Sequence, residues 1–412
     1  MTHRADWERA VAGVLRKTGR LATEAADHEA IATITRHTID GIEVHPLPEP
    51  TPPPSAATRG RARGNWDIRV LADPDAVGLE EGATSVWFPR ADQHRLQAQL
   101  EALALDRTPV ILDGHPDSAP ASVTTFRRAL GNRQAAPTTN LGYDAAASDA
   151  AANPQALADL LEAARELGVL AAVADATTIH DRGASDVLEL AYALACGTAW
   201  LRAAAAHGLS AEEAAALLEF RFAATADQFA TIAKLRAARS CWASLCPDAP
   251  IMRQHAVTSR PMMTRYDAHT NLLRTTVAAF SAAVGGADSI TVLPYDAALG
   301  EPDADARRLA RNISALLHAE SHLGVVDDPA GGAPAVEALT NSLAAAALAQ
   351  LEEIEAAGGI GSAGADAWCE QALTAIRERR DRAIATRRQP ITGVSEFPLA
   401  DESPIHRDGT PL

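Results

Sequence analysis

Short apolar runs alternate with longer segments of helical periodicity from Trp66 onward. Each run has the length and the residue types of a buried strand. The eight runs are, in chain order, Ile68–Leu71, Ser85–Phe88, Val110–Leu112, Asn140–Gly142, Val169–Ala174, Phe220–Ala223, Met252–Val257 and Ser289–Leu293. The helices predicted between them include Asp186–Ala206, Ala226–Trp242, Asp267–Val284 and Asp303–Leu317. This alternation predicts an α/β protein, a (β/α)8 TIM barrel built on a parallel sheet.

Segments without this alternation lie at both ends of the chain. Residues 1–64 begin with a helical pattern and continue through a turn and short strand at Thr38–Val44 into a proline-rich stretch at 46–64. That stretch cannot pack as a regular element, so it is either a disordered connector or a strap over a partner subunit. The barrel is expected over 65–388, including two late helices at Ala333–Ala356 and Ala365–Thr386. Residues 389–412 lack a helical period and are expected to form a short tail or a linker stub.

The composition excludes several classes of partner. The 412 residues are 47% hydrophobic but only 4% aromatic, and their formal net charge is −16. A charge of that sign argues against nucleic acid and anionic membranes as partners. No long uncharged apolar run predicts a membrane span, and the N-terminus has no secretory signal. The four cysteines lack metal-binding spacing, so we expect a cytoplasmic protein with reduced thiols and no metal site.

The loop after the fifth predicted strand is rich in polar residues, at the end of the barrel where TIM-barrel enzymes place their chemistry. His180 and Asp181 in this loop could act as an acid–base pair. Adjacent side chains usually point apart, however, and Asp181 or Ser185 could instead cap the helix that is predicted to begin near Asp186. The sequence alone leaves both interpretations open.

The seventh predicted strand carries a cation and an imidazole on one face. Arg253, His255 and Val257 share that face because side chains alternate along a strand. On the inner face or rim of a barrel, Arg253 and His255 need polar partners or an anionic ligand. The alternatives are therefore an anion-binding pair and a hydrogen-bonded pair within the barrel. The sequence contains no nucleotide-binding or zinc-protease motif.

The most distinctive parts of the sequence are five segments, which together closely resemble the methylmalonyl-CoA mutase family. They are Arg253–Asp267, Leu273–Gly300, Leu309–Gly332, Phe229–Leu245 and the run that begins at Gly183. The resemblance covers roughly Trp66 to Gly359. Catalytic members of this family combine a barrel that binds acyl-CoA along its axis with a C-terminal domain that holds cobalamin through a D-x-H-x-x-G motif. This chain contains no such motif, so the resemblance implies that it binds no cofactor itself.

The resemblance also shows which family catalytic residues are replaced. Thr177 and Thr178 take the places of a catalytic Tyr-His pair, and Asp288 takes the place of a glutamine that touches the substrate. The active-site tyrosine of the family falls near Arg61. The resemblance therefore implies that no residue of this chain is catalytic.

One anion-binding residue of the family persists. Arg253 matches an arginine that contacts CoA in the catalytic barrel. His255 and Ser321 are expected to be further contacts of this kind, vestigial if the barrel no longer binds CoA.

These substitutions make the chain similar to the small subunit of the heterodimeric members of the family. The resemblance implies a non-catalytic subunit paired with a large catalytic subunit, which interconverts (R)-methylmalonyl-CoA and succinyl-CoA with its own adenosylcobalamin. One alternative is the substrate-binding barrel of a split acyl-CoA mutase that uses a separate cobalamin protein. Another is a free-standing acyl-CoA-binding or scaffold barrel. The sequence leaves open whether the barrel still binds acyl-CoA.

Overall fold

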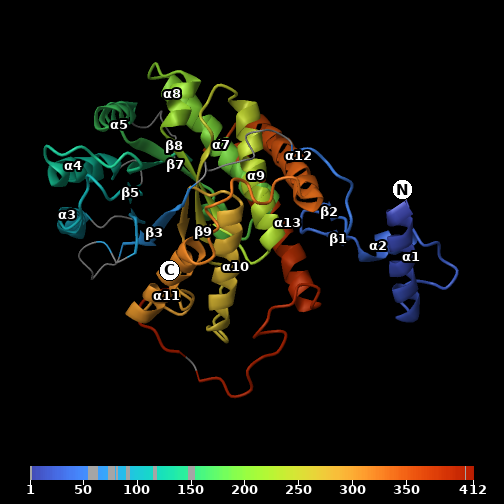
Figure 1. The fold of residues 1–412 in the computed structure, drawn as a ribbon. Coiled ribbons are helices and arrows are strands. Elements are labelled where there is room, and N and C mark those ends of the chain that lie inside the picture. Colours follow the sequence, from blue (N-terminus) through green and yellow to red (C-terminus); the bar gives the residue numbers. More distant parts are fainter. Residues whose placement is uncertain are drawn as a thin grey trace.

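A closed barrel of parallel strands forms the centre of the molecule. The computed structural model describes residues 2–53, 64–72, 79, 82–89, 93–114, 118–146, 154–403 and 405–412. Eight strands close in the order β10-β3-β4-β5-β6-β7-β8-β9 (Figure 1). They are β3 (Asp67–Leu71), β4 (Ser85–Phe88), β5 (Val110–Leu112), β6 (Asn140–Asp144), β7 (Leu170–Asp175), β8 (Leu218–Ala224), β9 (Arg253–Thr258) and β10 (Ser289–Thr291). The predicted TIM barrel is confirmed, and each predicted strand is found with its ends shifted by two residues or fewer.

Helices surround the barrel, and several begin at a side-chain cap. The helices of the barrel region are α3 (Gln93–Glu101), α4 (Ala119–Leu130), α5 (Pro154–Leu167), α6 (Thr177–Asp181), α7 (Asp186–Ala205), α8 (Ala211–Ala216), α9 (Gln228–Leu245), α10 (Thr270–Val284), α11 (Ala304–Ala319), α12 (Pro334–Ala356) and α13 (Ala363–Ala385). Asp227 and Asp303 each accept a hydrogen bond from a main-chain amide in the first turn of their helix. The helices predicted at Ala226 and Asp303 therefore begin one or two residues later than expected, because these aspartates act as caps and are not helical residues.

Part of the main core lies between the outer face of the sheet and the helices α7 and α9, and α12 packs against these two helices. All three helices are rich in alanine, whose small side chain allows close packing of their backbones. Gly197 of α7 shows how tight the packing is: a Cβ at this position would lie 2.8 Å from atoms of Phe220 and Trp242. Any side chain here would overlap the aromatic pair that connects β8 to α9.

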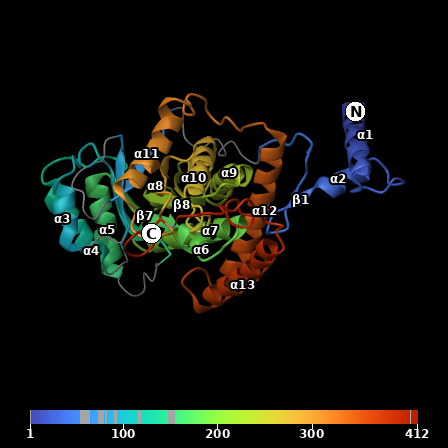
Figure 2. The ribbon, with the colours of Figure 1, turned by 90° about the horizontal axis from the view of Figure 1, so that it is seen from below.

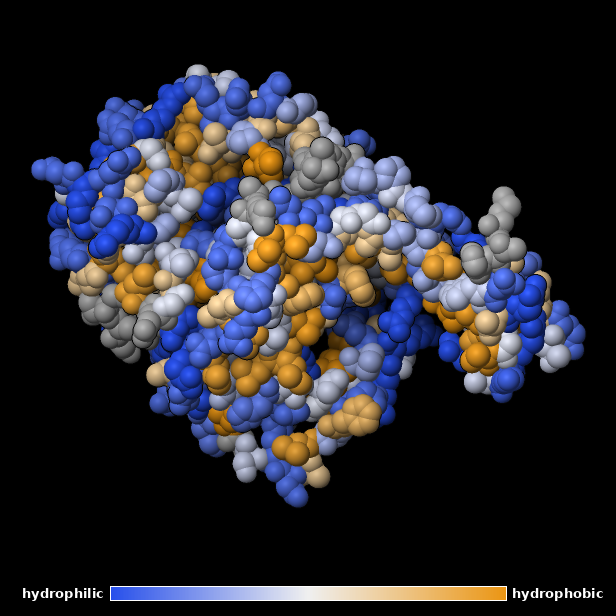
Figure 3. All heavy atoms as spheres, viewed as in Figure 1, coloured by the Kyte–Doolittle hydropathy of each residue, from blue (hydrophilic) through white to orange (hydrophobic). Residues whose placement is uncertain are grey.

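The N-terminal arm stands apart from the barrel. It consists of α1 (Thr2–Lys17), α2 (Glu29–Ile34), β1 (Arg36–His37) and β2 (Glu43–Val44), and α1 and α2 project to one side of the molecule (Figures 1 and 2). The two helices share a small apolar cluster that includes Ala12, Leu15 and Ala30. Apolar side chains also gather on the surface of the projecting arm (Figure 3), where Val14 is 61% exposed.

The hairpin of β1 and β2 fixes the arm to the barrel. Asp40 in its turn accepts hydrogen bonds from the Ser185 hydroxyl and the Val187 amide at the start of α7. A carboxylate is stabilised at a helix N-terminus, although burial raises the pKa of Asp40. Further along, the Pro52 carbonyl accepts from Asn341 Nδ2 of α12 at 3.3 Å. Residues 54–63 of the proline-rich stretch, including Arg61, lie outside the described residues.

The C-terminal tail leaves α13 and returns to the barrel beside α11 (Figure 1). Arg274 of α10 donates to the Thr392 carbonyl at 2.5 Å, and the Asp267 amide donates to Glu402 Oε1 at 2.6 Å. Arg407 donates to Asp296 at 2.5 Å, at the end of the last strand, and to Asp303 at 2.6 Å. These contacts hold the tail along the barrel. None of the helices in the described part of the chain is long and apolar enough to cross a membrane.

Candidate functional site

Charged and polar side chains fill the inside of the barrel. Along each strand alternate residues point inward, and register pairs such as Glu219 with Arg253 and Arg221 with His255 point to the same side. Arg69, Glu219, Arg221 and His255 are each 1% exposed or less. Buried charges require partners, so the contacts among these residues decide what the barrel can hold.

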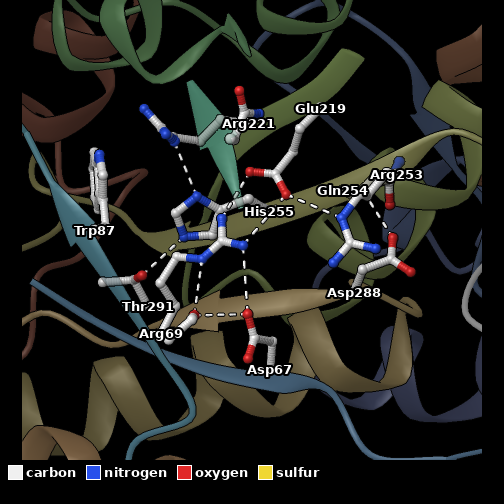
Figure 4. Close-up of polar contacts among 12 residues, drawn as sticks. Asp67, Arg69, Trp87, Glu219, Arg221, Arg253, Gln254, His255, Asp288 and Thr291 are labelled. Carbon is white, nitrogen blue, oxygen red and sulfur yellow. Dashed lines mark hydrogen bonds and ion pairs between the residues drawn. The ribbon is translucent and has the colours of Figure 1, made fainter. Parts of the chain in front are cut away.

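A first cluster lies toward the N-terminal end of the strands. Arg69 Nη1 donates to Glu219 Oε1 at 2.7 Å, and Arg253 Nε donates to Glu219 Oε2 at 3.3 Å (Figure 4). Arg69 also donates to Ser85 Oγ at 3.3 Å and to Asp67 Oδ2 at 3.4 Å. Burial alone would raise the pKa of Glu219, but Arg69 and Arg253 outweigh it and lower that pKa. Glu219 is therefore a carboxylate held between two guanidinium groups.

A second cluster lies toward the C-terminal mouth. Arg221 Nη1 donates to Asp113 Oδ2 and to Asp175 Oδ2, both at 2.6 Å, and Nη2 donates to Asp113 Oδ1 at 3.0 Å. Its guanidinium carbon lies 4.2 Å from the ring centroid of Trp87, within range of a cation–π interaction. Trp87 Nε1 donates to the same Asp113 oxygen at 2.6 Å. Arg221 is thus fixed across the interior by residues of β4 and β7 and by Asp113 beyond β5.

His255 belongs to the cluster at the mouth and is a neutral imidazole. Its Nδ1 accepts from Arg221 Nε at 2.9 Å, which leaves Nε2 to donate to Thr291 Oγ1 at 2.8 Å. Burial, together with Arg69, Arg221 and Arg253, lowers the pKa of His255 well below its ordinary value. The environment thus fixes both the charge and the tautomer of this ring.

Apolar side chains occupy the remaining interior. Trp87, Ile111, Val173, Val257 and Leu293 pack together, joined by Met263 and Ala297 beyond the strands. With the two polar clusters they form continuous layers, as in an ordinary packed TIM barrel. A ligand could follow the axis only after this network had been broken.

The three predicted anion-binding residues lie in different places. Arg253 opens β9, so it stands at the N-terminal end, and its side chain is 26% exposed while it contacts Glu219. His255 faces the interior, as predicted, and its partners are Arg221 and Thr291. Ser321 is an exposed residue just after α11. The structure places Arg253 in the cluster around Glu219 and His255 in the cluster around Arg221, and it leaves Ser321 on the surface.

The residues that the family resemblance predicts to stand in catalytic positions, Thr177, Thr178 and Asp288, form hydrogen bonds within the chain. Thr177 Oγ1 donates to Asp175 Oδ1 at 2.5 Å, and Thr178 Oγ1 donates to the Asp175 carbonyl at 2.8 Å. Asp288 lies just before β10 and accepts from the Gln254 amide at 2.7 Å. Burial raises the pKa of Asp288, although Arg253 opposes the shift.

His180 and Asp181 point apart, so they do not form the acid–base pair. His180 is buried, with Nδ1 at 3.0 Å from Glu189 Oε2 and Nε2 at 2.8 Å from Ser259 Oγ. Asp181 instead accepts from Arg260 at 3.0 Å on the outside. The cap of α7 is Ser185, which accepts from the Leu188 amide at 3.3 Å.

The sequence interpretation missed the residues at the centre of the network, namely Arg69, Asp113, Glu219 and Arg221. A signal for some of them is present. Glu219 and Arg221 stand two residues apart in a strand that is otherwise mostly apolar, and Asp67 and Arg69 do the same in β3. A period of two places both charges of each pair on one face. Among the described residues, no group of three or more His, Cys, Asp or Glu side chains could hold a metal ion.

Comparison with known proteins gives a consistent result. A family model described as methylmalonyl-CoA mutase matches residues 161–408. The methylmalonyl-CoA mutase small subunit of Streptomyces virginiae is 42% identical over 98% of this chain and 72% of its own length. The small subunit of Propionibacterium freudenreichii subsp. shermanii is 38% identical over 95% of this chain and 68% of its own length. A methylmalonyl-CoA mutase of Cereibacter sphaeroides is 37% identical over 55% of this chain and 33% of its own length.

The buried arginine at the mouth should be essential to stability. We expect Arg221→Met to lower the free energy of unfolding by about 3–5 kcal/mol, because it leaves Asp113 and Asp175 without their shared cation. The matched control is Arg202→Met, which removes the partly exposed ion pair with Glu355 and should cost no more than about 1 kcal/mol. Denaturant unfolding of both variants measures the difference, and equal losses would contradict the assigned role.

The neutral His255 should make stability depend on pH. Because its pKa is lowered in the folded state, the unfolded chain binds a proton below about pH 6.5 that the folded chain does not. Stability is therefore retained above that pH and falls below it, by up to about 1.4 kcal/mol per pH unit from this residue. We expect His255→Gln to flatten the dependence of the unfolding free energy between about pH 6.5 and 5. Parallel curves for the two proteins would show that His255 is not the group responsible.

Proposed function

Since the chain belongs to the methylmalonyl-CoA mutase family, we propose that it is a non-catalytic small subunit that pairs with a large catalytic subunit. In this proposal the large subunit binds adenosylcobalamin and the acyl-CoA and interconverts (R)-methylmalonyl-CoA and succinyl-CoA. The present chain supplies a stable barrel and an arm that hold the partner. We expect the assembly to be cytoplasmic.

The observation that carries the non-catalytic role is the closed barrel axis. The proposal needs an interior that does not admit an acyl-CoA, and Arg221 lies across that interior between Asp113 and Asp175. The cation at the mouth is also not offered to the substrate. Asp113 and Asp175, with side-chain exposures of 21% and 19%, are both paired with Arg221, so the guanidinium is already occupied.

The residues at the mouth do not fit the chemistry of a cobalamin mutase. Radical rearrangement needs groups that hold the substrate beneath the cofactor. The corresponding positions here carry Thr177 and Thr178, whose hydroxyls are turned to Asp175. No reaction step is therefore assigned to this chain, and the cofactor is placed in the partner.

The projecting arm supports the proposed pairing. The helices α1 and α2 stand off the barrel (Figure 1), and Val14 of α1 is 61% exposed. Val11 and Leu21 are only partly buried against the small apolar cluster of the arm. An arm of this kind offers apolar side chains that a second subunit could cover, and such contacts commonly dominate the affinity of an interface. The interpretation of the proline-rich segment as a strap is consistent with the same role.

The pairing can be tested by assembly with a large mutase subunit. We expect the tagged chain to co-elute with it in size-exclusion chromatography, and we expect mutase activity only in fractions that contain the large subunit. Val14→Glu should weaken the complex at least about ten-fold if the arm is the contact. Leu316→Glu is the matched control, because Leu316 is 47% exposed on α11, on the other side of the molecule from the arm.

Two outcomes would overturn this proposal. Failure of the chain to associate with any large mutase subunit would remove the pairing. Mutase activity from this chain with a separate cobalamin protein, and without a large subunit, would establish the split-mutase alternative instead.

A further inference from the structure

A serine, a histidine and a glutamate form one line of hydrogen bonds at the C-terminal mouth of the barrel. Ser259 directly follows β9, His180 lies in α6 after β7, and Glu189 lies in the first turn of α7. His180 Nε2 lies 2.8 Å from Ser259 Oγ, and His180 Nδ1 lies 3.0 Å from Glu189 Oε2. The same order of groups makes a serine nucleophilic in hydrolases of several unrelated folds.

The partners of Glu189 set the tautomer of the histidine. Lys234 Nζ donates to Glu189 Oε2 at 2.7 Å, and the Ala223 amide donates to Oε1 at 2.7 Å. Burial would lower the pKa of Lys234, but the two carboxylates that it contacts outweigh this effect and raise that pKa. A carboxylate paired with a cation accepts the proton of His180 Nδ1, which leaves Nε2 as an acceptor. The hydroxyl of Ser259 therefore donates to Nε2, as general-base catalysis requires.

A main-chain amide lies beside the serine hydroxyl. The Met262 amide donates to Ser259 Oγ at 3.3 Å, and the Ser259 amide donates to the Ala224 carbonyl at 2.7 Å, which fixes the main chain at this point. When Oγ bonds to a carbonyl carbon, the oxygen of that carbonyl lies next to Oγ, within reach of the same Met262 amide. This donor is therefore in a position to stabilise the negative charge that develops on the carbonyl oxygen.

The surroundings of the serine favour a small substrate. Ser259 is 2% exposed and His180 is 8% exposed. The next residue after each of them, Arg260 and Asp181, join in an ion pair at 3.0 Å with side-chain exposures of 26% and 29%. A partly exposed pair of this kind contributes about 1 kcal/mol or less, so these two side chains separate at low cost. We therefore expect access for a short acyl group and not for a long one.

We propose that Ser259 is a nucleophile toward small carboxylic esters, with His180 as its general base and Glu189 as the residue that positions the imidazole. Ser259 Oγ bonds to the carbonyl carbon while its proton passes to His180 Nε2. The ester C–O bond then breaks, and the alcohol leaves with the proton from His180. Water next attacks the acyl group and gives a proton to His180, the carboxylic acid leaves, and Ser259 regains its proton from His180.

This activity is separate from mutase chemistry. Hydrolysis of an ester needs water and no cofactor, and the line includes neither Thr177 nor Thr178, which the family resemblance places at catalytic positions. The proposal therefore does not depend on the small-subunit role.

The first test is covalent labelling of the full chain with diisopropyl fluorophosphate. The phosphorus of this reagent bonds to an activated serine oxygen and fluoride is released, so peptide mass mapping identifies the modified residue. We expect modification at Ser259, and modification at least about ten-fold slower in His180→Gln because the general base is lost. Ser281→Ala is the matched control and should react like the unaltered chain. Ser281 is also buried, but its hydroxyl donates to the Val277 carbonyl at 2.7 Å and not to a histidine.

The second test is hydrolysis of p-nitrophenyl acetate, whose acyl group is short. We expect Ser259→Ala to lower kcat about 100-fold or more. Glu189→Gln should lower kcat at least about ten-fold with KM unchanged, because loss of the carboxylate disturbs the imidazole and not the binding of the ester. Circular dichroism checks that each variant is folded.

Absence of modification at Ser259 in the unaltered chain would overturn the proposal, and this result does not depend on the folding of any variant. A folded Ser259→Ala that hydrolyses the ester as fast as the unaltered chain would overturn it as well. Assembly with a large subunit is measured separately, so failure here leaves the pairing unaffected.

Discussion

The structure depends on one buried guanidinium. Arg221 is 0% exposed, and its charge is tolerable only because Asp113, Asp175, Trp87 and His255 surround it. Each of these contacts reaches Arg221 from a different part of the sheet, so one side chain fixes the spacing of several strands at once. Removal of Arg221 would leave the carboxylates of Asp113 and Asp175 without their shared cation, which is far more costly than the loss of a surface ion pair.

The same constraint is the physical basis of the proposed non-catalytic role. A barrel that must admit a long ligand along its axis cannot fill that axis with paired charges. Here the clusters around Glu219 and Arg221 make the interior a rigid core. The arm of α1 and α2 lies outside the axis, where it is accessible to a partner.

The fold could be predicted from the sequence because its signal is local. The apolar runs located all eight strands. The hydrogen-bond partners inside the barrel could not be predicted. Arg221 and Asp113 are 108 residues apart in the sequence, and no local sequence pattern indicates that they are in contact. The predicted first residue of some helices was wrong for a different reason. Aspartate is common both at the N-cap and in the first helical turn, so the sequence did not show that Asp303 is the cap of α11 and not its first residue. The sequence also left open whether His180 and Asp181 form an acid–base pair. Only the structure shows that their side chains have different partners, Glu189 and Arg260.

The central claim is that the barrel axis is closed to acyl-CoA, and calorimetric titration of the purified chain with succinyl-CoA tests it most directly. The account predicts no saturable binding to the unaltered chain, because Arg253 contacts Glu219 and the interior above it is filled. Saturable binding that Arg253→Gln removes would contradict the account. It would show that the arginine at the N-terminal end of β9 still receives the ligand.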